Sequence, residues 1–285
     1  MEKILKGMPA AKAMDEKTKE NVELLVSKNV YPTLGILRIG ERKDDVAYEN
    51  ATIKRCQKLG INIKRMSFPI DVEQDVVLGE INKFNEDDSI HGILMFRPLP
   101  KHLNEKEICD AISADKDVDG VSEISMANVY SGNKKALAPC TAVSCMEMLK
   151  FYGVELTGKT VAVIGRSLVI GKPVSMLLQS EDATVIMCHS KTKNLENITK
   201  SSDIVVACLG KAEILGDKYF REGQIVIDVG INWSESKQKI VGDVDFDNVV
   251  ETVEAITPVP AGVGSLTTAV LAKHVVSAAL NKIKE

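Results

Sequence analysis

The sequence predicts an α/β protein built from two α/β domains, the second of Rossmann type. Two observations indicate this fold class. Short apolar, β-branched runs alternate with longer amphipathic stretches along the whole chain. A fresh strand–turn–helix pattern, TGKTVAVIGRS, then opens at residue 157, past the middle of the 285 residues. That length accommodates two medium domains with ample core.

The composition excludes several classes of protein. The formal net charge of −4 gives no reason to expect a nucleic acid or a membrane surface as partner. No apolar run approaches the roughly 18 residues of a membrane span, and the charged first 20 residues do not form a signal peptide. The six cysteines form no CxxC pair, which argues against a metal site or disulfide framework and favours a reducing cytoplasm.

The apolar runs predict strands in both halves of the chain. Because they are continuously apolar and separated by helical patterns such as 10–28 and 172–180, they favour parallel sheets covered on both faces. The predicted strands are 33–40, 61–68 and 91–96 in the first half, and 160–165, 183–189, 203–210, 224–232 and 254–260 in the second.

The domain boundary is predicted near residues 140–160. Residues 144–156 have the pattern of a bridging helix. The last stretch, 265–285, is helical and has no strand of its own, so we expect it to return to the first domain. The predicted division is therefore 1–142, completed by 266–285, and 143–265.

The stretch TVAVIGRSLVIGKPVSMLL predicts a dinucleotide-binding turn. It has a buried strand, a turn containing Gly165 and Gly171, and a helix that begins near Lys172–Pro173. Such a helix start offers N–H groups and a positive dipole end to a phosphate. The spacing is not GxGxxG, so a tight turn that binds nothing is the alternative.

The next predicted strand indicates which dinucleotide binds. It ends in CHSKT, without the acidic residue that grips the ribose of NAD. Arg166 and Ser190 offer a charge and a hydroxyl to a 2′-phosphate, which favours NADP. The alternatives are a solvated surface arginine and, for His189, a hydrogen-bonded turn histidine. Because ligands bind at the carboxyl ends of such strands, Gly210, Gly230 and Ile231 are expected to border the nicotinamide.

Several motifs in order carry a family resemblance. With GRSLVIGKP, CHSKT, DVGIN, GDVDF and TPVPAGVGSLT, the chain closely resembles methylenetetrahydrofolate dehydrogenase/cyclohydrolase. In the first half the likeness depends on Tyr48, CQKLGI, the GIL…PLP segment, KDVDG and PCT. The resemblance implies a cleft between two α/β domains, NADP-linked oxidation of 5,10-methylenetetrahydrofolate to 5,10-methenyltetrahydrofolate, and, in many members, hydrolysis to 10-formyltetrahydrofolate. It also implies a homodimer paired through the cofactor domains, with residues 203–210 and their flanking helices as a plausible interface.

The resemblance also implies roles for individual residues. Tyr48 stands at the position that stacks on the pterin, and Asp119 at the carboxylate that anchors it. Pro260, Ala261 and Gly262 stand in the loop that closes over the folate, where the family more often has Gly at position 261. The positions that contact NADP in the family are Gly165, Arg166, Ser167, Ser190, Ile231 and Thr267.

The chain departs from the family at its catalytic lysine, which stands four residues after the tyrosine. Here that position is Thr52, and the nearby lysine is Lys54. A helix turns about 100° per residue, so position +4 returns to within roughly 40° of Tyr48, whereas +6 lies roughly 120° away. Lys54 is therefore expected to point out of the site.

A second departure accompanies the first. Phe96 replaces the glutamine that is expected to hydrogen-bond that lysine, and it has the bulk to fill the volume that the lost pair leaves. Arg97 is expected to face the other side of the strand. Nearby, VSE (121–123) replaces the family's FHP, and Ala142 replaces a proline.

These departures bear on one reaction more than the other. Hydride loss from the methylene carbon is driven by the neighbouring nitrogen lone pair and needs positioning rather than a protein base. Hydrolysis needs an acid/base or a charge that activates water. The prediction is a dehydrogenase with weak or absent cyclohydrolase. The alternatives are a bifunctional enzyme, in which Lys54 or a shifted water network compensates, and a silent protein that binds NADP or folate.

Overall fold

The computed structural model describes residues 2–133 and 135–283, which divide into two compact units. The five-stranded unit comprises the chain up to Lys12 together with Thr141–Thr267. The three-stranded unit comprises Ala13–Cys140 and the chain from Thr268 onward. The sequence-based division placed residues 1–12 in the first domain, whereas here they contact the five-stranded unit. Leu5 N–H, for example, donates to the carbonyl of Ile256.

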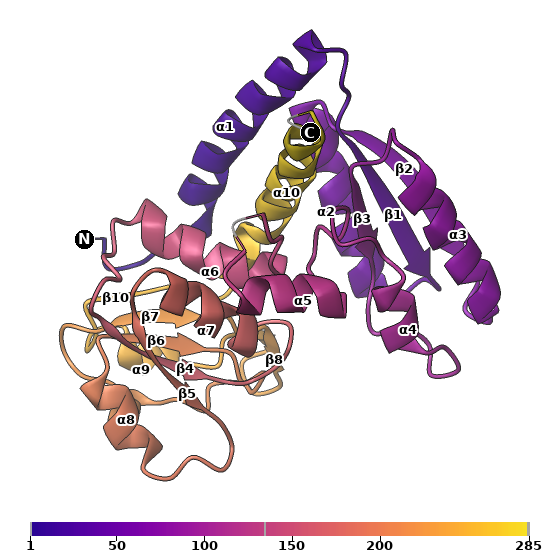
Figure 1. Cartoon of the computed structure of the whole chain (residues 1–285). Coiled ribbons are helices and arrows are strands. Elements are labelled where there is room, and N and C mark those ends of the chain that lie inside the picture. Colours follow the sequence, from indigo (N-terminus) through magenta and orange to yellow (C-terminus); the bar gives the residue numbers. More distant parts are fainter. Residues whose placement is uncertain (1, 134, 284–285) are drawn as a thin grey trace. The chain divides into compact units, whose positions relative to one another are not determined.

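The three-stranded unit is built around parallel strands in the order β2-β1-β3. Figure 1 shows these strands side by side, with α3 alongside them. Its apolar core includes Val77, Ile81 and Phe84 from one face of α3. The elements are α1 (Gly7–Ser27), β1 (Thr33–Ile39), α2 (Lys43–Leu59), β2 (Asn62–Phe68), α3 (Gln74–Glu86), β3 (Gly92–Met95), α4 (Glu105–Asp110), α5 (Glu123–Tyr130) and α10 (Thr267–Lys282).

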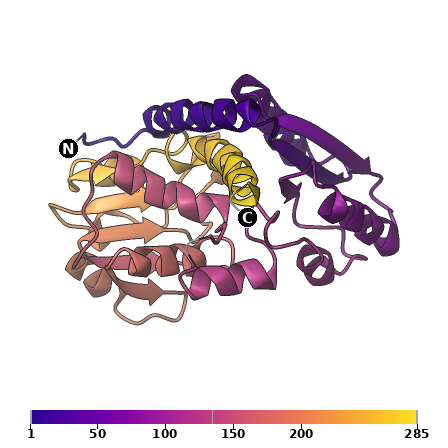
Figure 2. The same cartoon turned by 45° about the horizontal axis from the view of Figure 1, so that its top comes forward.

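The five-stranded unit contains a parallel sheet of order β10-β7-β6-β4-β5. Figure 2 shows the strands of this sheet side by side. Numbered from β4, this order is that of a doubly wound sheet, with a switch point between β4 and β6. The elements are α6 (Cys140–Phe151), β4 (Thr160–Ile164), α7 (Gly171–Ser180), β5 (Thr184–Cys188), α8 (Leu195–Ser201), β6 (Ile204–Ala207), η1 (Asp217–Tyr219), β7 (Ile225–Asp228), β8 (Asn232–Ser234), β9 (Lys239–Val241), α9 (Phe246–Val249), β10 (Ala255–Ile256) and η2 (Val263–Ser265).

The predicted α/β fold class is confirmed, and each predicted strand is present. The antiparallel hairpin of β8 and β9 was not predicted. The predicted bridging helix begins earlier and ends earlier, as α6. Strand β6 is fully buried at the centre of its sheet. No helix in the described part of the chain is long and apolar enough to cross a bilayer.

Candidate functional site

The turn after β4 places a glycine, which has no side chain, at the switch point of the larger sheet. Gly165 has a φ of +139°, a conformation that side chains rarely permit. A Cβ added there would lie 2.3 Å from the carbonyl oxygen of Cys208, which follows β6. Only glycine therefore fits between the two strand ends. The absence of a side chain at this point allows a pyrophosphate to approach the backbone closely.

The same turn leads directly into α7. A Cβ on Gly171, the first residue of α7, would lie 2.3 Å from the carbonyl oxygen of Gly165. The Ser167 hydroxyl accepts a hydrogen bond from the Ile170 N–H at 3.1 Å, which holds the loop closed. The predicted glycines thus serve a compact turn that presents the N-terminus of a ten-residue helix.

The side chains predicted to meet a 2′-phosphate are accessible. Arg166 and Ser190 are exposed, and Arg166 makes no ion pair within residues 2–133 and 135–283. A guanidinium and a hydroxyl at the ends of β4 and β5 fit an added phosphate. The imidazole of His189 accepts from the Lys191 N–H at 3.1 Å, as expected for a turn histidine.

A buried aspartate that the sequence analysis missed organises the turn after β7. Asp228 is 3% exposed, and its carboxylate accepts from the backbone N–H groups of Gly230, Asp243 and Val244 at 2.9–3.0 Å. Burial raises the pKa of Asp228 to about 7, although these hydrogen bonds act in the opposite direction.

Asp243 completes this arrangement from the other side of the β8–β9 hairpin. It is fully buried and accepts from the backbone N–H groups of Leu209, Gly210 and Lys211. It also accepts from the side-chain amide of Asn232 at 2.9 Å. One carboxylate therefore fixes the turn after β6 against the segment after β7. The sequence signals were the aspartates of DVGIN and GDVDF, which were recognised as motifs without this role.

A cavity of about 280 Å³ gathers several predicted residues of the five-stranded unit. Ile231, Pro260, Ala261 and Gly262 all line it, and Ile231 is 69% exposed. Residues 30 positions apart are therefore neighbours here. The cavity has the mixed apolar and backbone character of a small-molecule site.

The loop that lines this cavity is held by backbone contacts. Ala261 has a φ of +79°, in the left-handed region where glycine is favoured. Its carbonyl accepts from the Gly7 N–H at 2.8 Å. Thr267 lies at the start of α10, and its hydroxyl donates to the Gly264 carbonyl at 3.2 Å. The departure from glycine at 261 thus falls on a position where glycine has a physical advantage.

Helix α2 in the three-stranded unit places Thr52 and Lys54 on different faces. Thr52 is fully buried, Tyr48 is half-buried and Lys54 is exposed. This matches the angular positions of an ideal helix. The Thr52 hydroxyl makes no hydrogen bond with any residue that the structure describes. Position 52 therefore carries neither an ammonium nor an activated hydroxyl.

Phe96 contacts the predicted pterin platform. Its ring and that of Tyr48 meet edge to face, with centroids 6.1 Å apart and an interplanar angle of 79°. Phe96 is 8% exposed. An aromatic side chain thus lies against Tyr48 where the family pattern has an amide.

A charge cluster next to Thr52 was also missed. Glu49 is 2% exposed, and one carboxylate oxygen accepts from Arg38 Nε at 2.6 Å. The other oxygen lies 3.2 Å from Arg65 Nε, without hydrogen-bond geometry. Arg38 is itself 5% exposed. The buried face of α2 is therefore polar, but its carboxylate is neutralised by two guanidinium groups.

Asp119 lies near the carboxyl end of β3. A parallel bridge between Ile93 and Asp117 carries the KDVDG segment along this strand. Asp119 is half-buried and accepts from the Cys140 N–H at 3.1 Å. Burial raises its pKa, while the Arg97 guanidinium acts in the opposite direction.

In the described part of the chain, one cluster of three acidic side chains has carboxylate oxygens close enough together to hold a metal ion. It consists of Glu213, Asp245 and Asp247. The Lys237 ammonium pairs with Glu213 and lies 3.0 Å from an oxygen of Asp247. An ammonium therefore already compensates much of this negative charge.

Comparison with known proteins identifies both units. The family model described as "Tetrahydrofolate dehydrogenase/cyclohydrolase, catalytic domain" matches residues 5–119. The model described as "Tetrahydrofolate dehydrogenase/cyclohydrolase, NAD(P)-binding domain" matches residues 139–283. The second match covers the turn of Gly165 and the cavity of Ile231.

Individual relatives agree with these matches. The chain is 47% identical over 275 residues to the bifunctional protein FolD of Clostridioides difficile (strain 630), and the alignment covers 96% of each protein. The crystal structure of the bifunctional enzyme FolD from Campylobacter jejuni has a TM-score of 0.94 at 37% identity, covering 98% of this chain and 99% of that one. The Trypanosoma brucei FolD, solved with NADP cofactor and inhibitor, has a TM-score of 0.91 at 32% identity, covering 100% of both chains.

Proposed function

The chain belongs to the tetrahydrofolate dehydrogenase/cyclohydrolase family, and on that premise we propose that it is an NADP-dependent 5,10-methylenetetrahydrofolate dehydrogenase with weak or absent cyclohydrolase activity. The observation that carries the second part is position 52. There the lysine of the family is replaced by a fully buried threonine whose hydroxyl has no described partner.

The features of the five-stranded unit support NADP binding. Gly165 and the start of α7 receive the pyrophosphate, and Arg166, Ser167 and Ser190 bind the adenosine end with its 2′-phosphate. Ile231 borders the nicotinamide, and Thr267 contacts the cofactor from the start of α10. The bound nicotinamide supplies the hydride acceptor.

The three-stranded unit retains groups suited to a tetrahydrofolate derivative. Tyr48 presents an aromatic face to the pterin, and Phe96 holds that ring from its edge. Asp119 anchors the pterin through hydrogen bonds, and because burial raises its pKa it retains a proton more readily than an exposed carboxyl. Pro260, Ala261 and Gly262, which belong to the five-stranded unit, form the loop that the resemblance expects to close over the folate. These residues position and orient the substrate, which is the main requirement of hydride transfer.

Hydrolysis makes a demand that these residues do not meet. Water must be activated, and protons must reach the ring nitrogen as the ring opens. Thr52 has a hydroxyl whose pKa is unsuited to this without a strong base beside it, and Glu49 is held by Arg38 and Arg65. Lys54 lies on the exposed face of α2.

Two alternatives have their own support. The relatives named above as bifunctional favour an enzyme that also hydrolyses the methenyl product, through Lys54 or a shifted water network. The altered side chains around Tyr48 favour, more weakly, a protein that binds NADP or folate without turnover.

A single assay separates these readings. Purified protein is mixed with methylenetetrahydrofolate and NADP, and methenyl product and NADPH are followed by absorbance. Equal accumulation of both supports the dehydrogenase, and NADPH without methenyl product supports the bifunctional enzyme. Absence of both, with NADP binding in a thermal-shift assay, supports the silent protein.

Variants then test the role of position 52. The Thr52→Lys and Phe96→Gln double variant is expected to gain methenyl hydrolysis, whereas the matched Thr52→Ser variant is not. A double variant that folds, produces NADPH and still fails to hydrolyse methenyltetrahydrofolate contradicts the assignment of the loss to this pair.

We also propose a cytoplasmic homodimer paired through the five-stranded unit. Trp233 and Ile240 are cross-strand partners of the β8–β9 hairpin and are 54% and 42% exposed, which supports an apolar contact there. Sedimentation velocity of the protein and of its Trp233→Glu variant tests this, since the variant is expected to shift toward monomer.

A further inference from the structure

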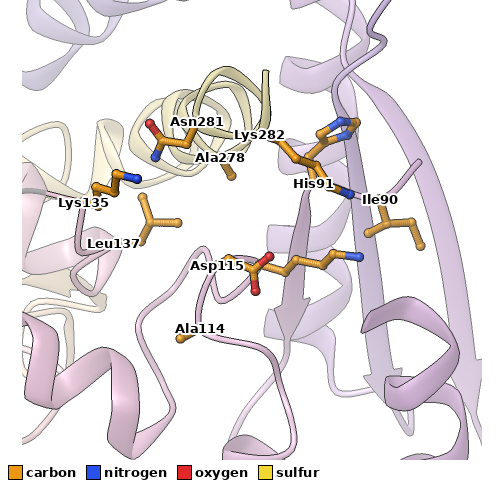
Figure 3. Close-up of a pocket in the computed structure, with 10 residues that line it drawn as sticks. Ile90, His91, Ala114, Asp115, Lys135, Leu137, Ala278, Asn281 and Lys282 are labelled. Carbon is orange, nitrogen blue, oxygen red and sulfur yellow. The ribbon is translucent and has the colours of Figure 1, made fainter. Parts of the chain in front are cut away.

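A separate cavity of about 110 Å³ lies in the three-stranded unit, at the amino end of β3. Figure 3 shows side chains around it that come from the start of β3, from the loops after α4 and α5, and from the last turn of α10. Its lining residues are Ile90, His91, Ala114, Asp115, Lys116, Lys135, Leu137, Ala278, Asn281 and Lys282.

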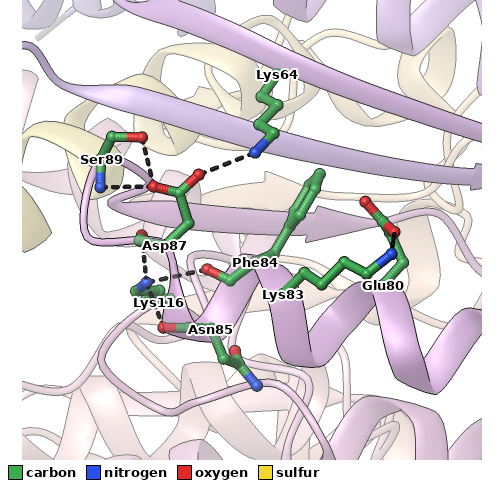
Figure 4. Close-up of polar contacts among 8 residues, drawn as sticks. All are labelled: Lys64, Glu80, Lys83, Phe84, Asn85, Asp87, Ser89 and Lys116. Atoms are coloured by element: carbon green, nitrogen blue, oxygen red, sulfur yellow. Dashed lines mark hydrogen bonds and ion pairs between the residues drawn. The ribbon is translucent and has the colours of Figure 1, made fainter.

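The cavity is rich in positive charge. Lys116, Lys135 and Lys282 line it, with Asp115 as the only carboxylate among the described lining residues. Lys116 is 4% exposed, and its ammonium donates to backbone carbonyls of Phe84, Asn85 and Asp87 at the end of α3, as Figure 4 shows. These contacts hold one cation in a fixed position beside the cavity.

His91 adds a buried polar group. It is 6% exposed, and its Nδ1 accepts from the Thr33 N–H at 3.3 Å. The neutral ring therefore carries its proton on Nε2. The Ser89 backbone also hydrogen-bonds the ring, so His91 is a fixed part of the cavity wall. Burial lowers the pKa of His91, and the charges of Lys282 and Lys116 lower it further, while the Ser89 hydrogen bond and the Asp87 carboxylate act in the opposite direction.

Within the described residues, Lys282 pairs with an exposed aspartate. Its ammonium lies 2.6 Å from a carboxylate oxygen of Asp88, whose side chain is 93% exposed, and it also donates to the Asp88 carbonyl at 3.2 Å. Such an exposed pair contributes little, so an anion competes with it readily. Asn281 stands beside Lys282 and offers an amide N–H.

We propose that this cavity binds a small polyvalent oxyanion of the phosphate class. Lys282 and Asn281 supply donors to the cavity, and Lys116 adds a fixed positive charge whose own N–H groups are directed at backbone carbonyls, which favours phosphate over a cation or a neutral apolar ligand. The site is separate from the region of Tyr48, because Phe96 follows the opposite end of β3. Four strand residues span roughly 13 Å. The proposal depends on neither NADP nor folate.

The direct test is titration of the full chain with inorganic phosphate. Thermal unfolding and calorimetry are followed at constant ionic strength, with sodium chloride as the replacement salt. A saturable rise in melting temperature with phosphate and none with chloride is expected. Equal effects of both salts would mean screening alone and would overturn the proposal.

Variants locate the site. Lys282→Gln is expected to weaken phosphate binding at least fivefold, whereas Asp88→Asn is expected to strengthen it by releasing Lys282. Lys19→Gln, an exposed lysine of α1 in the same unit, is the matched control and leaves affinity unchanged. Saturable binding that none of the Lys282 and Asp88 variants alters would place the anion elsewhere and contradict the assignment.

Histidine NMR provides a readout independent of stability. Phosphate is expected to shift the His91 ring resonances and to raise its pKa, because a bound anion favours the imidazolium. The resonances are assigned with His91→Gln. Resonances of His91 that stay unmoved at saturating phosphate would also overturn the proposal.

Discussion

The two units differ in how their ligand sites are built. In the five-stranded unit the predicted cofactor site is largely backbone: Gly165 packs against the turn after β6, and buried aspartates hold the neighbouring turns. In the three-stranded unit the predicted folate site depends on side chains, and the family resemblance places Thr52 and Phe96 at positions where it implies a lysine and a glutamine. A site made from backbone is preserved with the fold, whereas catalytic side chains can be lost from an intact scaffold.

The largest effect on cofactor binding is expected from Gly165→Ala. The added Cβ collides with the Cys208 carbonyl oxygen at 2.3 Å, and the φ of +139° is strained for alanine. We expect NADP affinity to fall by roughly 100-fold or more, measured by calorimetry, with a loss of about 3 kcal/mol in the free energy of unfolding.

Gly216→Ala is the matched control. A Cβ at Gly216 meets nothing within 4 Å, and its φ is −84°. Its NADP affinity is expected to equal that of the unmodified protein. If Gly165→Ala bound NADP as tightly as this control, the backbone account of the cofactor site would be wrong.

Asp228 is expected to make stability depend on pH. Its pKa is about 7 when folded, against an ordinary value of 3.8, so the folded protein binds this proton more tightly. The stabilisation that Asp228 adds to the free energy of unfolding is fully present below about pH 4. It is lost as pH rises through 7, and the total loss is on the order of 4 kcal/mol. Urea unfolding of the protein and of Asp228→Asn from pH 4 to 8 measures this. A variant with the same pH slope as the unmodified protein would exclude Asp228 as the source.

Arg166→Ala tests whether a side chain also contributes to the cofactor site of the five-stranded unit, which is otherwise formed mainly by backbone. Arg166 is exposed and available for the 2′-phosphate. We expect NADP affinity to fall by roughly 10- to 150-fold, since a charge-assisted hydrogen bond contributes about 1.5–3 kcal/mol, while NAD affinity changes little. Parallel losses for both cofactors would show that Arg166 does not contact the 2′-phosphate.

Ala261→Gly is expected to have the smallest effect and the opposite sign. At a φ of +79° alanine is strained, and glycine relieves about 1 kcal/mol of that strain. Part of the gain is offset by the greater freedom of glycine in the unfolded chain. Denaturant unfolding is expected to show a modest increase in stability, and a decrease would mean that the methyl group makes a compensating contact.

Much of the fold was predictable because its strands can be recognised from short stretches of sequence. Continuous apolar runs such as TVAVI and IVID form β4 and β7, and the glycine turn after β4 follows directly from sequence. Helical periodicity alone placed Thr52 on the face of Tyr48 and directed Lys54 out of the site, and in the structure Thr52 is buried and Lys54 is exposed.

The unpredicted features depend on tertiary contacts. Asp228 and Asp243 lie 15 residues apart and meet because the β8–β9 hairpin folds back, yet its strands are three residues each and carry exposed Trp233 and Ile240. The pair of Arg38 and Glu49 joins a strand to a helix, and neither charge has a local partner in sequence to reveal it. Such buried polar contacts follow from packing and have no short-range signal.

The central claim is most directly tested by methenyltetrahydrofolate hydrolysis measured alone. Purified protein, shown in the same preparation to form NADPH from methylenetetrahydrofolate, is added to methenyltetrahydrofolate and the decay of its absorbance is compared with buffer. The account predicts that hydrolysis per enzyme molecule is absent or far slower than NADPH formation by the same preparation. Enzyme-dependent hydrolysis as fast as NADPH formation would contradict it.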